Sequence, residues 1–259
     1  EAVSGQLPEG RNGAAEAREV LAAYLTRRFP ELFVADGDCL VDLQTGLRTA
    51  LTDDQPLRDT ARLVQEDFVV MSRHPRGEWR MTAACVCFPS RWSLSEKLGQ
   101  GLADIHGPVP FYGERLGASV PTMFDRLSTD SPKLRFNWTL IDSPELFQSQ
   151  PPVGRERRPD EDPGSSLWVR IERQTLRRLP RSGDVLFTIR TFVRPLADLQ
   201  QAQPRDLEAL AATLTSTPRQ TLEYKGIAEV VPDVARWLGA GGAPDSRGRE
   251  CDSAPPAHP

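Results

Sequence analysis

Apolar residues recur at helical spacing near the start of the chain, around its middle and over its last third. In the first of these segments, Val20, Leu21, Tyr24 and Leu25 share one helical face, and Pro30 ends the periodic run. A capping box, Ser93 followed by Glu96, marks the start of a helix in the middle of the chain. The predicted helices cover residues 14–30, 56–65, 93–105, 120–127, 204–217, 217–226 and 227–239.

Runs of β-prone residues separated by turn residues indicate two hairpins. Residues 67–73 and 80–88 flank the turn HPRGEW, and residues 167–179 and 184–193 flank PRSG. The segment LRFNWTLI, residues 134–141, predicts one further strand. Because the strands lie between groups of helices, we expect an α+β fold, an antiparallel sheet with flanking helices.

Glycine, proline and charged residues gather in three places that we expect to lack regular structure. These are a flexible N-terminus at 1–12, a charged loop at 151–166 and a disordered tail at 241–259. The remainder, residues 13–240, is long enough for a single domain with a sizeable core.

Composition and charge exclude several classes of function. The net charge of −4 argues against a nucleic-acid partner. The sequence has no apolar run long enough to cross a membrane and no secretory signal, so we expect a cytoplasmic protein without a membrane partner. The cysteines lack zinc or ferredoxin spacing and favour free thiols in a reducing compartment. The sequence has no recognisable nucleotide-binding loop or hydrolase motif.

His106 is the first candidate for chemistry. Leu94, Leu98 and Leu102 recur at every fourth residue of the predicted helix, and His106 continues this series before Gly107 and a proline end the helix. Such a histidine is either a satisfied core or capping residue, or a neutral ligand for a flat apolar cofactor. The other histidines are in weaker positions, His74 at a turn and His258 in the tail.

Polar residues on the predicted strands form a second group of candidates. Strand alternation places Trp168, Arg170, Glu172 and Gln174 on one face of their strand, while Arg135 and Asn137 share a face of theirs. In the same way, Arg190 shares a face with Leu186, Thr188 and Phe192. These residues form either the solvated face of an antiparallel sheet or a buried polar site beside a cofactor. Likewise, Arg135 and Glu172 could hold a cofactor propionate or form a surface ion pair.

Three segments together resemble a known family. CFPSRWSLSEKLGQGLADIHGPVPFY, then LRFNWTL, then WVRIERQTLRRLPRSGDVLFTIRTFVRPL occur in this order. They resemble the haem-dependent oxidative N-demethylase family, which includes the α subunit of a dimethylamine monooxygenase. The resemblance covers about residues 30 to 240.

This resemblance implies a PAS-like sheet over residues 13–240 that binds haem b and activates O₂, removing a methyl group from a small-molecule amine as formaldehyde. His106 is then the iron ligand, and His106, Arg135 and Trp138 are cofactor-binding residues. Arg135, Glu172 and Arg190 are the catalytic candidates, facing the oxygen side or a propionate. Electrons from NAD(P)H are expected to arrive through a separate reductase. The alternatives are a non-catalytic PAS-type haem sensor and a haem-free interaction module.

Overall fold

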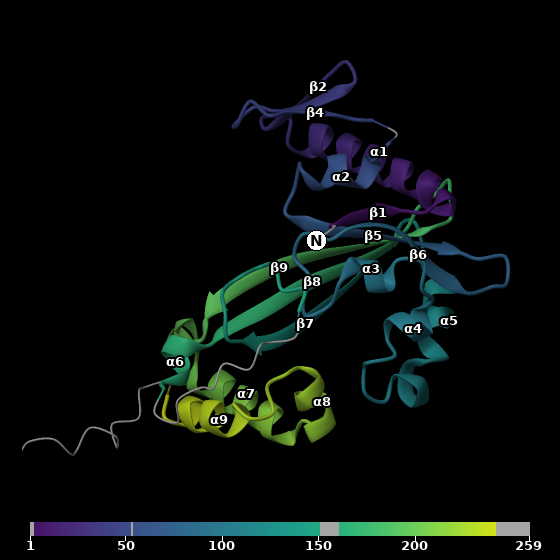
Figure 1. Ribbon diagram of the computed structural model, residues 1–259. Coiled ribbons are helices and arrows are strands. Elements are labelled where there is room, and N and C mark those ends of the chain that lie inside the picture. The colour runs from purple at the N-terminus through teal and green to yellow at the C-terminus, as the bar shows by residue number, and fades with distance from the viewer. Residues whose placement is uncertain (1–2, 53, 151–160, 242–259) are drawn as a thin grey trace, which may run out of the picture. The chain divides into compact units, whose positions relative to one another are not determined.

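The computed structural model describes residues 3–52, 54–150 and 161–241 (Figure 1). The chain divides into two compact units. The first comprises residues 1–138, 145–151 and 171–192, and the second comprises residues 139–144, 152–170 and 193–259. The predicted loop at 151–166 and the predicted tail at 241–259 lie mostly outside the described residues. Whether residues 13–240 form one domain stays a prediction.

A six-stranded antiparallel sheet organises the described chain and confirms the predicted α+β class. Its strand order is β1-β6-β5-β9-β8-β7, so the two predicted hairpins, β5 with β6 and β8 with β9, lie side by side through β5 and β9. The strands are β1 (Ser4–Gln6), β5 (Glu66–Arg73), β6 (Trp79–Cys85), β7 (Lys133–Ile141), β8 (Trp168–Arg178) and β9 (Val185–Pro195).

The start of the chain is more ordered than its composition suggests. Ser4 pairs with Cys85 and Gln6 with Ala83, so β1 extends the sheet beyond β6 within the segment that we expected to be flexible. The next residues form the short turn η1 (Pro8–Gly10). These residues pair with a strand that is distant in the sequence, and local composition does not predict such pairing.

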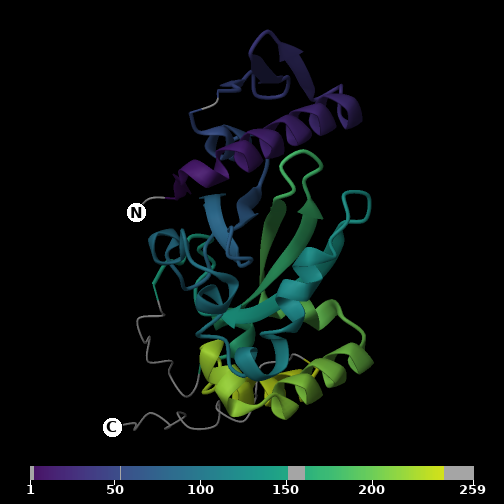
Figure 2. The ribbon, with the colours of Figure 1, turned by 90° about the vertical axis from the view of Figure 1, so that its right-hand side faces the viewer.

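Two helices cover one face of the sheet in the first unit. The long helix α1 (Arg11–Arg28) and the short α2 (Pro56–Ala61) pack there on β5, β6 and β9 (Figure 2). The buried carboxylate of Glu16 accepts hydrogen bonds of 2.8 Å from the backbone N–H groups of Arg181 and Ser182. The turn between β8 and β9 is therefore fastened to α1. The core on this face includes Ala14, Ala17, Leu57, Phe68, Val70, Ala83 and Leu186.

The opposite face of the sheet carries short helices, and here one prediction is wrong. In place of a single helix over 93–105, the chain forms α3 (Leu94–Lys97) and α4 (Leu102–Ile105). Gly99 has a φ of +85°, its N–H donates to the Met81 carbonyl at 2.7 Å, and the Met81 N–H donates to Gln100. Because this segment pairs with the edge of β6, the helix ends where glycine permits a positive φ.

Apolar residues from these helices and from α5 (Ser119–Asp125) nevertheless share one core with the sheet. Leu94 and Leu102 pack there, and Leu98 lies against the same cluster although it is not helical. Ile105, the residue before His106, also packs against this core. Its buried members include Val69, Met71, Trp79, Met81, Phe124, Leu127, Leu176 and Val185.

The second unit contains the predicted C-terminal helices, with shorter bounds than the sequence suggested. They are α7 (Pro204–Ser216), α8 (Arg219–Tyr224) and α9 (Val231–Gly239), preceded by α6 (Pro163–Ser166) and η3 (Leu196–Gln201). Gly164 approaches Trp237 so closely that an added Cβ would lie 2.7 Å from the indole. Val234, Trp237 and Leu238 of α9 are buried.

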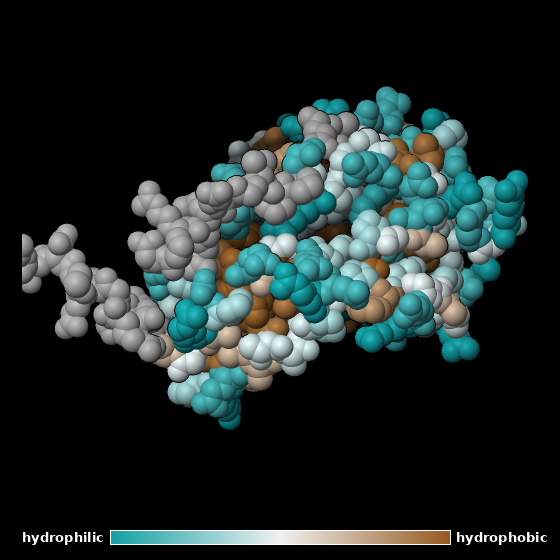
Figure 3. Space-filling view, turned by 60° about the horizontal axis from the view of Figure 1, so that its bottom comes forward, coloured by the Kyte–Doolittle hydropathy of each residue, from teal (hydrophilic) through white to brown (hydrophobic). Residues whose placement is uncertain are grey.

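A small three-stranded sheet was not predicted. It has the order β2-β3-β4 and consists of β2 (Phe33–Asp36), β3 (Cys39–Asp42) and β4 (Arg48–Ala50). No helix of the described residues is long and apolar enough to cross a membrane. On the face that Figure 3 shows, apolar residues are exposed in groups among hydrophilic ones, which is common in folded proteins and does not by itself mark a site.

Candidate functional site

His106 directly follows α4 and uses one ring nitrogen to end that helix. Its Nδ1 lies 2.8 Å from the carbonyl oxygen of Leu102. A carbonyl can only accept, so Nδ1 carries the proton and the lone pair is on Nε2. Burial lowers the pKa of His106, the Leu102 carbonyl opposes this, and the positive charges of Lys97 and Arg135 lower it further. The imidazole is therefore neutral at pH 7 and has the tautomer of a metal ligand that binds through Nε2.

The ring of Tyr112 is stacked on His106. The two ring centroids are 4.7 Å apart and the planes differ by only 6°. The chain returns to His106 through a tight turn, in which Val109 N–H donates to the His106 carbonyl at 2.8 Å and Phe111 has a φ of +62°. Tyr112 begins the helical turn η2 (Tyr112–Leu116), and burial raises its pKa. Sequence reasoning missed Tyr112, although it closes the HGPVPFY motif.

The polar residues of β8 form a buried group. Glu172 and Gln174 are each 8% exposed, so the solvated-face interpretation of these side chains is wrong. The Oε2 atom of Glu172 accepts hydrogen bonds from Gln174 Nε2 at 3.0 Å and from Asn137 Nδ2 at 3.3 Å. These amide donors stabilise the charged carboxylate at a depth where a carboxylate without hydrogen bonds would be costly.

Two cations complete this side of the sheet. The Lys97 ammonium lies 4.5 Å from the centroid of the Trp92 ring, and its pKa is lowered by burial, against which the charges of Glu96 and Glu172 act. Arg135 is exposed on β7, and its charge, like that of Lys97, reaches His106. Lys97 was not predicted, and its half-buried position follows from the end of α3, which sequence periodicity misplaced.

A comparison with protein-family models identifies the relatives of this chain. The model of the haem-dependent oxidative N-demethylase, alpha subunit-like family matches residues 1–235. The chain belongs to this family. The resemblance inferred from three motifs is thereby confirmed, and the match extends to the first residue. Membership in the N-demethylase family indicates a haem-dependent oxidative function, and the description "alpha subunit-like" implies partner subunits.

The residues around His106 fit the haem that the N-demethylase family name implies. Among the described residues, no group of three or more His, Cys, Asp or Glu side chains could hold a bare metal ion. A haem carries most of the ligands of its iron itself, so a single neutral imidazole from the chain would be enough to hold it. Ile105, the residue before His106, packs against the apolar core, and the positive charges of Lys97 and Arg135, which act on His106, match the carboxylates of a haem.

The structure brings together three of the five residues that the sequence analysis selected, and separates the other two from them. His106, Arg135 and Glu172 lie on the face that carries α3 and α4, together with the unpredicted Lys97. Arg190 points to the α1 and α2 face, because β9 pairs it with Glu66 of β5, to which its Nη1 lies at 3.5 Å.

Trp138 also departs from the cluster. It follows Asn137 on β7, so strand alternation directs it to the face opposite Glu172. Arg173, next to Glu172, likewise points away and forms an ion pair of 3.2 Å with Glu66. The ion pairs of Glu66 with Arg173 and Arg190 therefore lie on the α1 and α2 side of the sheet, away from Glu172.

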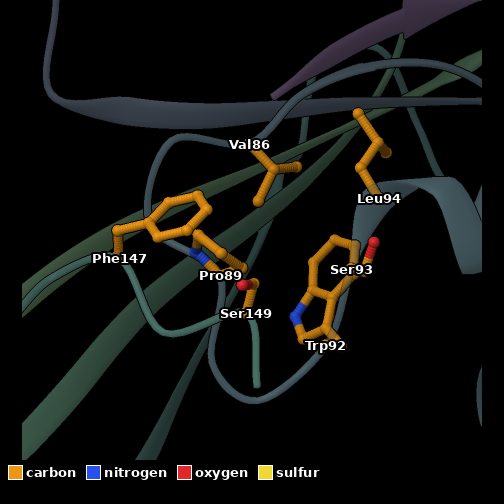
Figure 4. A pocket seen from close by; sticks show the side chains of 7 residues that line it. All are labelled: Val86, Pro89, Trp92, Ser93, Leu94, Phe147 and Ser149. Carbon is orange, nitrogen blue, oxygen red and sulfur yellow. The ribbon is translucent and has the colours of Figure 1, made fainter. Parts of the chain in front are cut away.

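A small hollow lies near the start of α3 (Figure 4). Trp92, Pro89 and Phe147 enclose it, together with Val86, Ser93, Leu94 and Ser149. Its cavity volume is about 10 Å³, which is room for about one water molecule. His106 does not line this hollow, so it is a gap behind Trp92 and is distinct from the candidate site.

Proposed function

We propose that this protein is the haem-binding subunit of an oxygenase that removes an N-methyl group from a small amine as formaldehyde. In this proposal His106 Nε2 would bind the iron of haem b. The observation that carries it is the hydrogen bond from His106 Nδ1 to Leu102, which fixes the ring and directs its lone pair to Nε2. Family membership supplies the identity of the cofactor.

Lys97 and Arg135 are proposed to pair with the carboxylates of the haem. Both carry charges that act on His106, which supports this assignment. Arginine and lysine bind carboxylates through charge-assisted hydrogen bonds. When bound, haem b would supply the iron at which O₂ is reduced by two electrons.

Glu172 is proposed to hold the amine. Methylated amines are cationic near pH 7, and the carboxylate that Asn137 and Gln174 hold in place by hydrogen bonds would attract an ammonium group and accept a hydrogen bond from it. The electrons are proposed to come from NAD(P)H through a reductase protein, since the sequence has no recognisable site for a nicotinamide or flavin and the family name implies further subunits. The antiparallel sheet supports a PAS-like fold, which also stays a proposal.

The test is the absorption spectrum of the full chain expressed with a haem precursor. Wild type should show the Soret band of a histidine-ligated haem, and His106→Ala should lose it or shift it. His74→Ala is the matched control, because His74 is at the turn between β5 and β6 and should leave the spectrum unchanged. An unchanged His106→Ala spectrum would refute the ligand assignment.

A second measurement separates an oxygenase from a haem sensor. With a chemical reductant and a series of methylated amines, an oxygenase consumes O₂ and releases formaldehyde in proportion. Glu172→Gln should retain the haem spectrum and lose most of the formaldehyde. A haem-loaded protein that consumes no O₂ with any amine, even in the presence of its partner subunits, would support the sensor alternative.

A further inference from the structure

The hydroxyl group of Tyr112 is buried without a hydrogen-bond partner among the described residues. The side chain is only 6% exposed. A buried hydroxyl usually finds an acceptor, and leaving it without one costs stability. Phenylalanine would give the same ring without this cost, so the hydroxyl calls for a partner outside the described residues.

The stack on His106 places Tyr112 beside the proposed axial ligand. Parallel rings 4.7 Å apart fix the plane of the imidazole, which the Leu102 carbonyl alone would leave free to turn about one hydrogen bond. Tyr112 would therefore lie on the same side of a bound haem as His106.

We infer that Tyr112 positions the cofactor, a role that rests on the proposed function: its ring orients His106, and its hydroxyl donates a hydrogen bond to a carboxylate of the haem. The two propionates are the only strong acceptors at the rim of haem b. Lys97 and Arg135, whose charges reach His106, place positive charge where such carboxylates would lie. A tyrosine hydroxyl can donate one hydrogen bond, and a carboxylate can only accept.

Two substitutions separate the parts of this role. Tyr112→Phe removes only the hydroxyl, whereas Tyr112→Leu also removes the stack. Tyr24→Phe is the control, since Tyr24 is 46% exposed on α1. The full chain, prepared without haem, is titrated with haemin and with haemin dimethyl ester, in which both carboxylates are blocked.

Tyr112→Phe should bind haemin about tenfold more weakly than wild type, the effect expected for a hydrogen bond to a charged group. It should bind the dimethyl ester as well as wild type does. Tyr112→Leu should weaken the binding of both compounds and shift the iron–histidine stretching band in the resonance Raman spectrum of the reduced protein. Tyr24→Phe should match wild type throughout.

Thermal melting of the haem-free proteins guards against a folding defect. Tyr112→Phe should melt no lower than wild type, because it removes a buried hydroxyl that has no partner in the described residues. If wild type binds haemin and His106→Ala does not, but Tyr112→Phe binds both compounds as wild type does, the inference is overturned and the proposed function stands. If wild type binds no haemin, both are overturned.

Discussion

The buried carboxylate of Asp184, where the turn between β8 and β9 meets α1, leads to a prediction of how the stability of the protein depends on pH. The residue is 8% exposed, and its carboxylate lies against Gly13 of α1. Burial raises the pKa of Asp184 from 3.8 to about 6; the nearby charge of Glu16 adds to this, while Ser72 and Arg178 oppose it. The folded protein therefore prefers the protonated form of this side chain.

The sign of the effect on stability follows from this preference. A group whose folded pKa is raised contributes stability below pH 3.8, and that contribution is lost as the pH rises through about 6. The shift corresponds to at most about 3 kcal/mol, and about half of that remains once screening by water near the turn is included. Asp184→Asn, which is neutral at every pH, should therefore unfold with a free energy about 1.5 kcal/mol higher than wild type at pH 7.5.

Urea unfolding followed by tryptophan fluorescence at pH 4, 6 and 7.5 measures this difference. The advantage of Asp184→Asn should change little between pH 7.5 and pH 6 and shrink mostly between pH 6 and pH 4. Asp38→Asn, at an exposed turn between β2 and β3, is the control and should show no such trend. A variant less stable than wild type at pH 7.5 would refute the reasoning, because hydrogen bonds to the charged carboxylate would then outweigh its burial.

Three further predictions address other parts of the protein. Gly13→Ala should lower the melting temperature by several degrees, because an added Cβ would overlap the Asp184 carboxylate; an unchanged melting temperature would mean that α1 can shift away. A hydrogen bond from Cys85 lowers the pKa of Cys87 to about 7, so iodoacetamide at pH 7.5 should modify Cys87 well before buried Cys85, as peptide mass spectrometry would show; equal rates would contradict this. Glu172→Gln should reduce the rate of formaldehyde release at least tenfold with little change in haem affinity, and a parallel loss of haem would instead assign Glu172 to cofactor binding.

The hairpins and the fold class could be predicted from sequence because their signals are local. Alternating β-prone runs around HPRGEW and PRSG specify β5, β6, β8 and β9, and each predicted strand was found. The three small strands β2 to β4 and the N-terminal β1 were missed. They are three or four residues long and depend on partners elsewhere in the chain, so no periodic pattern of their own marks them.

The candidate site was predicted only in part. Local patterns found some of its residues, whereas pairing between distant segments decided the rest. The fourfold leucine spacing before His106 suggested one helix, but pairing of Gly99 and Gln100 with Met81 overrides helix propensity there. Alternation correctly grouped Glu172 with Gln174, yet it could not tell a buried face from a solvated one. Alternation also could not predict that Arg190 would lie beside Glu66, because that depends on the register between β5 and β9.

The most direct test of the central claim is the rescue of a histidine-deleted variant by free imidazole. His106→Gly, loaded with haem, should lack the Soret position and the iron–histidine stretching band of wild type, and millimolar imidazole should restore both. If His106→Gly retains the wild-type spectrum without imidazole, another residue holds the iron, and the account given for this site is wrong.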